Sequence, residues 1–265
     1  MMRIAKLSKD SFRSLMMWRV WMFLGGQDIK SRFRRSFFGP LWMVMTTGFF
    51  VGGVGVVYGV LFGQNMREFL PYLACGFSLW VFLVASFVEG STAYVRAEGY
   101  IKQFSYPKQI YLLRSLVSMA IALMIGLLVV MPVQLFFHTF QAMGWLLAIP
   151  GILLLFLAAL GNIAISAYIG VRFRDFPHAV GVLLQMLFFV TPIMFPAAVL
   201  QSKGLDFVYQ FNPLFYLLDV VRTPILTGEL ASAHSYGYVA AYIIISWFVA
   251  FMTALRFDSR VVFLL

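Results

Sequence analysis

Long uncharged stretches, separated by short charged segments, dominate the pattern of this chain. Residues 36–66, 69–88, 115–171, 176–202 and 230–255 contain no Asp, Glu, Lys or Arg. A helix needs about 20 apolar residues to cross roughly 30 Å of hydrocarbon. The third stretch is too long for one helix, and a turn at 138–141, with polar His138, Thr139 and Gln141, divides it. The pattern therefore predicts an all-α protein with six membrane spans, at 36–62, 69–88, 110–137, 142–171, 176–195 and 238–255.

The basic residues predict the orientation of these spans, because Lys and Arg near span ends stay on the cytoplasmic side. With the N-terminus in the cytoplasm, 17 of the 20 Lys and Arg residues fall on the cytoplasmic side, and Arg222 is one of the three on the outer side. We therefore expect both termini to be cytoplasmic. The chain then forms one transmembrane domain (1–265), made of an N-terminal segment (1–35), a six-span core (36–255) and a tail (256–265).

The N-terminal segment combines basic residues with an apolar run that Arg19 interrupts. A signal peptide would need an uninterrupted apolar core and a cleavage site with small residues. The pattern instead predicts an amphipathic helix that lies in the membrane interface. Its basic and apolar positions are Lys6, Lys9 and Arg13, and Phe12, Met16 and Phe23, respectively.

About 40 residues connect the last two predicted spans on the outer side. Within them, the uncharged run 207–218 is too short to cross a membrane, and runs of this length are typical of re-entrant or interfacial segments. Prolines interrupt the connection at several positions. We predict two short re-entrant helices, at 197–209 and 213–226. A loop that lies flat on the lipid headgroups is the alternative.

The composition supports a membrane protein and excludes a soluble enzyme or a disordered chain. Hydrophobic residues make up 62% of the chain and charged residues 11%, whereas soluble domains have about 45–50% and about 25%. The formal net charge of +10 follows from the cytoplasmic bias of the basic residues, so it requires no nucleic-acid partner. The single cysteine, Cys75, has no cysteine partner in the chain, and we expect it to pack as a small buried hydrophobe.

Chemically active groups are missing from the centres of the predicted spans. Ion-coupled transport needs ionisable groups at membrane depth, and hydrolysis in the membrane needs paired carboxylates or a nucleophile with a base. The closest approach to a phosphate-binding loop has Ile29 where Gly is required before Lys30. The sequence therefore predicts a transport protein without catalytic residues, metal site or nucleotide site. Its energy would come from another chain, or its transport would be passive.

Three segments of the chain carry recognisable motifs: 34–42 (RRSFFGPLW) at the start of the first span, 100–110 (YIKQFSYPKQI) in the first cytoplasmic loop, and 173–178 (FRDFPH) with 191–196 (TPIMFP) and 212–214 (NPL) around the fifth span. In this order they resemble the permease subunit of ABC-2 type exporters, in the branch that moves O-antigen, capsule and teichoic acid polysaccharides. The resemblance covers residues 30–226. Tyr106 is a mild departure, because the family usually has Phe before this proline.

The resemblance implies a homodimer in the bacterial inner membrane, with two copies of a separate ATPase subunit on the cytoplasmic face that hold ATP and magnesium. It implies a polysaccharide cargo that is linked to undecaprenyl diphosphate, and O-antigen is the first candidate for this polysaccharide. An exporter of a drug or small lipid is the rival within the superfamily. A passive lipid scramblase or a membrane scaffold is the rival from another class.

The resemblance also implies two groups of candidate residues. The ATPase-coupling loop would contain Glu98, Tyr100, Lys102, Phe104, Tyr106 and Pro107, unless this loop only connects two spans. The re-entrant helices would form an outer gate that includes Phe211, Asn212, Pro213 and Phe215.

The residue pattern suggests two further groups. A helical period of 3.6 places Trp42, Thr46 and Phe49 on one face of the first span, and Gln185, Phe188 and Phe195 on one face of the fifth. Aromatic faces suit sugar rings, so we expect these residues to line a channel, with lipid-facing aromatics as the alternative. Arg32, Arg34 and Arg35 could bind the lipid diphosphate at a cytoplasmic gate or could only orient the chain. Asn162, Ser166 and Gly170 on the fourth span are assigned to packing between helices.

Overall fold

The computed structural model describes residues 2–61 and 63–265, and side chains from residue 4 onward. The described residues form helices joined by loops and turns, with no strand among them, so the all-helical prediction is confirmed. Within these residues, five helical segments are long and apolar enough to cross a membrane. They contain α3 (Leu41–Leu61), α4 (Met66–Ser91), α7 (Gln109–Phe136), α8 (Ala142–Arg172) and α13 (Ala233–Phe257).

The fifth predicted span, 176–195, is shorter in the structure. Helix α9 covers Phe176–Val190, which is 15 residues or about 22 Å at 1.5 Å per residue. It ends there because Thr191 is extended, with ψ 134°, as expected for a residue before proline, and because Pro192 has no N–H to continue the helix. The C-terminal bound of this prediction was therefore wrong. The number of six spans stays a prediction.

The N-terminal segment forms two helices rather than one, α1 (Met2–Met16) and α2 (Trp18–Arg32), which meet at Met17. Phe12, Met16 and Phe23 are exposed, as an interfacial helix requires. Helix α2 packs on α7, and a Cβ atom at Gly25 would lie 2.8 Å from the carbonyl oxygen of Arg114. Most of the segment therefore presents apolar side chains outward while one side of α2 is fixed to the bundle.

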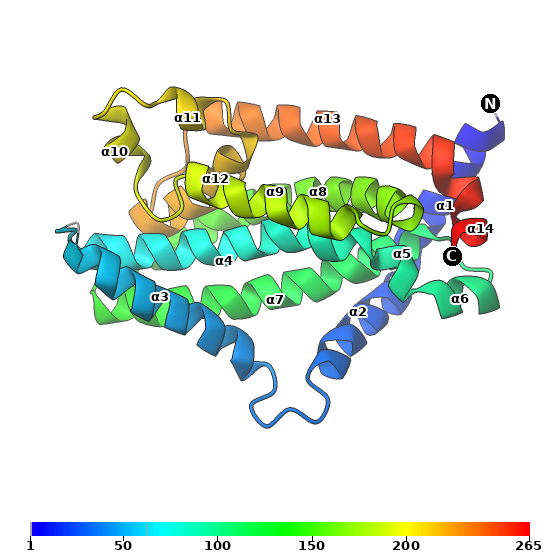
Figure 1. Cartoon of the computed structure of the whole chain (residues 1–265), viewed down its shortest axis with the longest axis horizontal. Helices are drawn as coiled ribbons and strands as arrows, with labels where there is room; N and C mark the ends of the chain where they lie inside the picture. The colour runs from blue at the N-terminus through cyan, green and yellow to red at the C-terminus, as the bar shows by residue number, and fades with distance from the viewer. Residues whose placement is uncertain (1, 62) are drawn as a thin grey trace.

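Helix α4 lies at the centre of the bundle (Figure 1) and contacts α3, α7, α8, α9 and also α12, which covers Pro213–Thr227. Small residues allow the close helix contacts, since a Cβ atom at Gly170 would clash with the carbonyl of Ser91. Asn162 accepts a hydrogen bond from Tyr242 at 2.7 Å and donates one to Ser86 at 3.3 Å. The predicted polar stripe on α8 thus faces its neighbours α4 and α13.

The connection after α9 contains three short helices: α10 (Ala197–Gln201), α11 (Phe207–Gln210) and α12 (Pro213–Thr227). The prediction of one helix at 197–209 was wrong. Gly204 has a φ of +68° and divides this range into two shorter helices. The predicted helix 213–226 is confirmed within one residue. Helix α12 is mostly buried among α8, α13 and α4, so it does not lie as a loop on a lipid surface.

The two ends of the bundle carry different elements (Figure 1). Both termini lie at the end that carries α5 (Ala93–Arg96) and α6 (Glu98–Gln103), together with the 3₁₀ helix η1 (Asp258–Arg260) and α14 (Val261–Leu264). We call this the α6 end. Helices α10 and α11 lie at the opposite end, which we call the α10 end.

Candidate functional site

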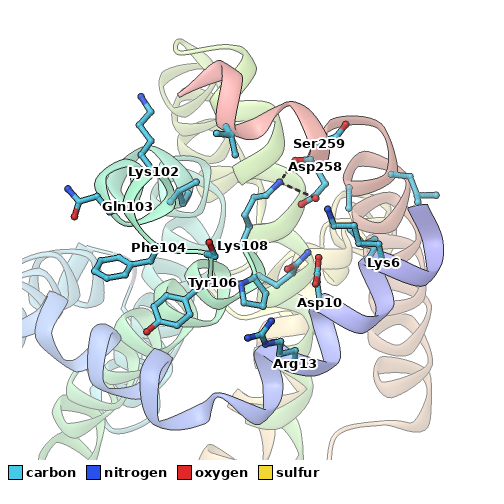
Figure 2. Close-up of a pocket in the computed structure, with 18 residues that line it drawn as sticks. Lys6, Asp10, Arg13, Lys102, Gln103, Phe104, Tyr106, Lys108, Asp258 and Ser259 are labelled. Atoms are coloured by element: carbon cyan, nitrogen blue, oxygen red, sulfur yellow. Dashed lines mark hydrogen bonds and ion pairs between the residues drawn. The ribbon is translucent and has the colours of Figure 1, made fainter. Parts of the chain in front are cut away.

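A polar cleft of about 660 Å³ opens at the α6 end of the molecule. Figure 2 shows that its walls come from α1, from α6 and the loop after it, and from η1. Its charged lining residues are Lys6, Asp10, Arg13, Lys102, Lys108 and Asp258. The cleft therefore joins three segments that are far apart in the sequence, and its lining carries more basic than acidic groups.

Three aromatic residues of the predicted coupling loop form one exposed surface beside this cleft, which we call the aromatic ridge. Tyr100, Phe104 and Tyr106 have exposed fractions of 41%, 48% and 41%. The rings of Tyr100 and Phe104 are 6.3 Å apart at 27°, and those of Phe104 and Tyr106 are 5.8 Å apart at 22°. Pro107, the next residue in the chain, is buried. Exposed aromatics of this kind are typical of the centre of a protein–protein interface.

The two predicted rim charges of the coupling loop pair with each other. Lys102 donates to Glu98 at 2.6 Å, one helical turn apart on α6. This hydrogen bond lowers the pKa of the Glu98 carboxyl. Because both side chains are largely exposed, the pair adds little to stability. It leaves two fixed charges beside the aromatic ridge.

Ion pairs connect the coupling loop to the membrane helices. Arg114 on α7 donates twice to Asp28 on α2, at 2.7 and 2.5 Å, and its guanidinium lies 5.3 Å from the Tyr100 ring centre. A movement of Tyr100 would therefore displace Arg114 and change the contact between α2 and α7. The sequence analysis missed the pair of Arg114 and Asp28, since the two lie 86 residues apart and no local pattern relates them.

A second connection holds the C-terminal end of α13. Lys108, directly after the buried Pro107, donates to the side chain of Asp258 at 3.1 Å and to its backbone carbonyl (Figure 2). The hydroxyl of Tyr168 on α8 donates to the same carboxylate at 3.0 Å. Asp258 thus joins the coupling loop, α8 and α13, a role that the sequence analysis missed.

The three arginines of the predicted cytoplasmic gate have different surroundings in the structure. Arg32 at the end of α2 pairs with Glu89 on α4 at 2.5 Å, and Arg96 donates to the backbone carbonyl of Glu89 at 2.8 Å. Arg34 and Arg35 are exposed on the turn between α2 and α3. In the part of the chain that the structure describes, neither has a carboxylate within ion-pair distance. The three residues therefore differ in their partners, and their role at a cytoplasmic gate stays a prediction.

The predicted channel faces of α3 and α9 are only partly brought together. A groove of about 390 Å³ between α3, α4 and α9 is lined by Gln185 and Phe188, together with Phe50, Phe77 and Trp80, which the sequence analysis missed. Phe188 is 5.9 Å from Trp80 and 6.3 Å from Phe50 between ring centres. We call this the aromatic groove.

The other predicted channel residues lie outside the aromatic groove. Phe49 exposes 69% of its surface, and Trp42, whose ring lies 5.3 Å from that of Phe38, exposes 44%. Thr46 lines a different cavity, between α3, α4 and α7. Phe195 is half-buried in the turn after α9. The sequence could not show which face of α3 lines a channel, because α3 is apolar on all sides. Phe49 and its neighbour Phe50 were therefore equally good candidates for the channel face.

The predicted gate residues sit where α9 ends and α12 begins. Asn212 caps α12 by accepting from the N–H of Leu214, and its amide donates to Thr191 at 2.8 Å. Pro213 occupies the first turn, where a missing N–H costs nothing. Phe215 is buried, whereas Phe211 is 78% exposed. The start of α12 is therefore fixed to the end of α9.

Arg222 of α12 is a buried cation that the sequence analysis placed only as an outer basic residue. It is 3% exposed and donates to the carbonyl of Pro192 at 2.7 Å. Its guanidinium lies 4.2 Å from the ring centre of Tyr72. The Tyr72 hydroxyl is within hydrogen-bond distance of the carbonyls of Pro192 (2.9 Å) and Phe195 (3.2 Å). Arg222 and Tyr72 thus satisfy carbonyls that the break after α9 leaves free.

Nothing in the described residues suggests bound metal, since they contain no group of three His, Cys, Asp or Glu that could hold an ion. The fold defines the class of protein instead. A bundle whose long helices are apolar over a membrane thickness is a multi-pass membrane protein.

The model of the ABC-2 type transporter family matches residues 19–226, which is most of the chain. The protein therefore belongs to the ABC-2 type transporter family. The match includes the coupling loop, the aromatic groove and helix α12, and it places the protein among the multi-pass proteins of the inner membrane.

Several known proteins match at low identity over more than four fifths of their length. The chain is 22% identical to the O-antigen export system permease protein RfbA of Myxococcus xanthus, over 83% of this chain and 86% of that protein. It is also 22% identical to RfbA of Klebsiella pneumoniae, over 81% of each. The chain is 22% identical to the polysialic acid transport protein KpsM of Escherichia coli, over 84% of this chain and 87% of that protein.

Proposed function

We propose that this chain is the channel-forming permease subunit of an ATP-driven exporter that moves a lipid-linked polysaccharide from the cytoplasm to the periplasm. O-antigen is the first candidate for this polysaccharide. The carrying observation is that relatives named for O-antigen export and polysialic acid transport match more than four fifths of the chain. The cargo would be attached to undecaprenyl diphosphate. An exporter of a drug or small lipid, or a passive scramblase, remains the rival.

The energy would come from two copies of a separate ATPase subunit that bind at the α6 end. The aromatic ridge supports this assignment, because its three rings are exposed on a short helix and loop next to a polar cleft. Aromatic side chains form the centres of such interfaces, and the Glu98–Lys102 pair would lie at the rim. The ATPase would hold ATP and magnesium.

Motion would pass from the aromatic ridge to the membrane helices through two sets of contacts. Tyr100 lies on the guanidinium of Arg114, which holds α2 through Asp28. Lys108 holds α13 and α8 through Asp258. Displacement of the coupling loop would therefore move α2, α7 and α13 together.

Two copies of the chain would enclose the channel. The exposed side of α3 carries Trp42 and Phe49, and the aromatic groove carries Gln185 and Phe188 at the boundary with α9. Aromatic faces attract the C–H groups of sugar rings weakly, so a polymer could slide without a selective pocket. At the α10 end, the contacts of α12 with the break after α9 would form the outer gate.

Deletion of the gene in its host tests the cargo. We expect loss of surface polysaccharide and accumulation of the completed polymer in the cytoplasm, with recovery when the intact chain is supplied. Unchanged surface polysaccharide would reject the proposal. Altered drug susceptibility or lipid composition with normal polysaccharide would favour the rivals.

A further inference from the structure

A narrow cavity of about 210 Å³ lies between α3, α4 and α7; it shares Phe77 and Val81 with the aromatic groove and otherwise takes no part in the proposed function. We call it the slot. Its walls include Met43, Phe77, Val81, Ala85, Met119 and Ala122. The wall hydroxyls of Thr46 and Ser78 donate to the helix carbonyls of Trp42, and of Ala74 and Gly126. These two hydroxyls are therefore satisfied within the protein. Two further hydroxyls, on Thr47 and Ser118, and the Arg32–Glu89 pair at one end also line the slot, and the rest of its wall is apolar.

The length of the slot matches one leaflet of a membrane. Along α4 its lining runs from Phe77 near the middle of the helix to Glu89 near its end. Twelve residues at 1.5 Å each span about 18 Å, and half of a hydrocarbon core is about 15 Å. Val81 lies between them and is 49% exposed, although most of its neighbours on α4 are buried. An extended acyl chain would cover this apolar side chain.

Positive charge collects where the slot reaches the α6 end. Arg32 and Arg96 both approach the carboxylate of Glu89, at 2.5 and 3.7 Å. Two guanidinium groups on one carboxylate leave one positive charge uncompensated. The side chain of Arg32 is 38% exposed, so its remaining donors are accessible, and guanidinium groups bind phosphate oxygens through paired hydrogen bonds.

We propose that the slot binds one acyl chain of an anionic phospholipid from the leaflet at the α6 end, with the lipid phosphate on Arg32. The apolar wall, the one-leaflet length and the net positive charge at the mouth match the three parts of this ligand. The bound lipid would contact the end of α2 and helices α3, α4 and α7. It would therefore make the position of α2 sensitive to the lipid composition.

The test is native mass spectrometry of the purified full-length chain in detergent, with phosphatidylglycerol as probe and phosphatidylethanolamine as the comparison. We expect tighter binding of phosphatidylglycerol. Arg32→Gln should weaken it about fivefold, as for one cation at the surface. Ala122→Phe should weaken it about tenfold by excluding two or more methylenes. Arg260→Gln, at an exposed position of η1, and Ala241→Phe, both outside the slot, are the matched controls.

Two results would overturn the proposal. One is equal affinity of the chain for phosphatidylglycerol and phosphatidylethanolamine, together with unchanged phosphatidylglycerol binding in Arg32→Gln. This substitution does not alter the packed core, so its result does not depend on refolding of the slot. The other is displacement of phosphatidylglycerol by undecaprenyl phosphate at equal concentration, with loss of that binding in Ala122→Phe. The slot would then hold the isoprenyl chain of a lipid carrier. Ala85→Val, a smaller change, replaces Ala122→Phe if the latter does not elute as folded protein.

Discussion

Single residues at the α10 end show how the break after α9 is stabilised. Pro192 and the residues after it leave carbonyl groups without helical partners at a position that the sequence places within a membrane span. Arg222 and Tyr72 bind these carbonyls, and Asn212 binds Thr191. A charge buried in this way is costly unless its donors are used. The arrangement therefore makes Arg222 a positioning residue for the contact between α9 and α12.

Arg222→Gln should destabilise the protein by about 2 kcal/mol, because it removes a charged hydrogen bond and a cation–π contact. Thermal unfolding in detergent measures this change, and surface polysaccharide in the host reports on the gate. Arg222→Lys keeps the charge but not the planar group over Tyr72, so we expect an intermediate loss. Lys203→Gln, at an exposed position of the same end, is the control. Wild-type stability and export in Arg222→Gln would contradict the assignment.

The aromatic ridge gives a second prediction at the scale of residues. Tyr100→Ala with Phe104→Ala should abolish co-purification of the ATPase subunit, because hot-spot aromatics each contribute about 2 kcal/mol or more to an interface. Both side chains are exposed, so the variant should elute and unfold like wild type. Phe263→Ala, an 88% exposed aromatic at the same end, is the matched control. Normal ATPase recovery with the double variant would place the interface elsewhere.

At the scale of elements, the lengths of uncharged stretches predicted the long helices well, because a charge inside a span is costly. Helices α4, α7 and α8 begin and end within three residues of the predicted bounds. The end of α9 and the turn at Gly204 were not predicted, since backbone breaks at Thr191 and Gly204 add no charge to the pattern. Long-range pairs such as Arg32 with Glu89 have no local signal at all.

Close packing of elements predicts a stability effect at Gly170. A Cβ atom there would clash with the backbone of Ser91, which has little freedom to move. Gly170→Ala should therefore push α8 from α4 and cost about 1–3 kcal/mol, the usual range for overpacking. Thermal unfolding measures the loss. Gly53→Ala on α3 has open space around the new methyl group and should unfold like wild type; equal behaviour of the two variants would contradict the packing account.

The aromatic groove between elements distinguishes the two predicted channel faces. Phe188→Ala leaves Trp80 and Phe50 without their partner on α9, and we expect reduced export at normal expression. Trp42→Ala tests the exposed side of α3 in the same assay. Phe248→Ala on the exposed side of α13 serves as a lipid-facing control. Unchanged export in both test variants would assign these aromatics to the lipid.

At the scale of the whole molecule, the chain is a bundle whose two ends carry different chemistry. Both termini, the aromatic ridge and the polar cleft lie at the α6 end, and the break after α9 lies toward the α10 end (Figure 1). The basic residues that predict orientation also form specific pairs, since Arg32, Lys108 and Arg114 each hold a carboxylate on another element. These three basic residues therefore have structural partners as well as a topological role, and the surplus of ten positive charges comes from basic residues without such partners.

The central claim is ATP-driven polysaccharide transport through this chain, and transport in inverted inner-membrane vesicles tests it most directly. The vesicles contain the ATPase subunit and radiolabelled lipid-linked polysaccharide on their outer, cytoplasmic face. We predict that ATP makes the polymer inaccessible to an added glycosidase when the chain is present, and that ATP has no effect in vesicles without it. Equal protection with and without the chain, or protection that does not depend on ATP, would contradict the account.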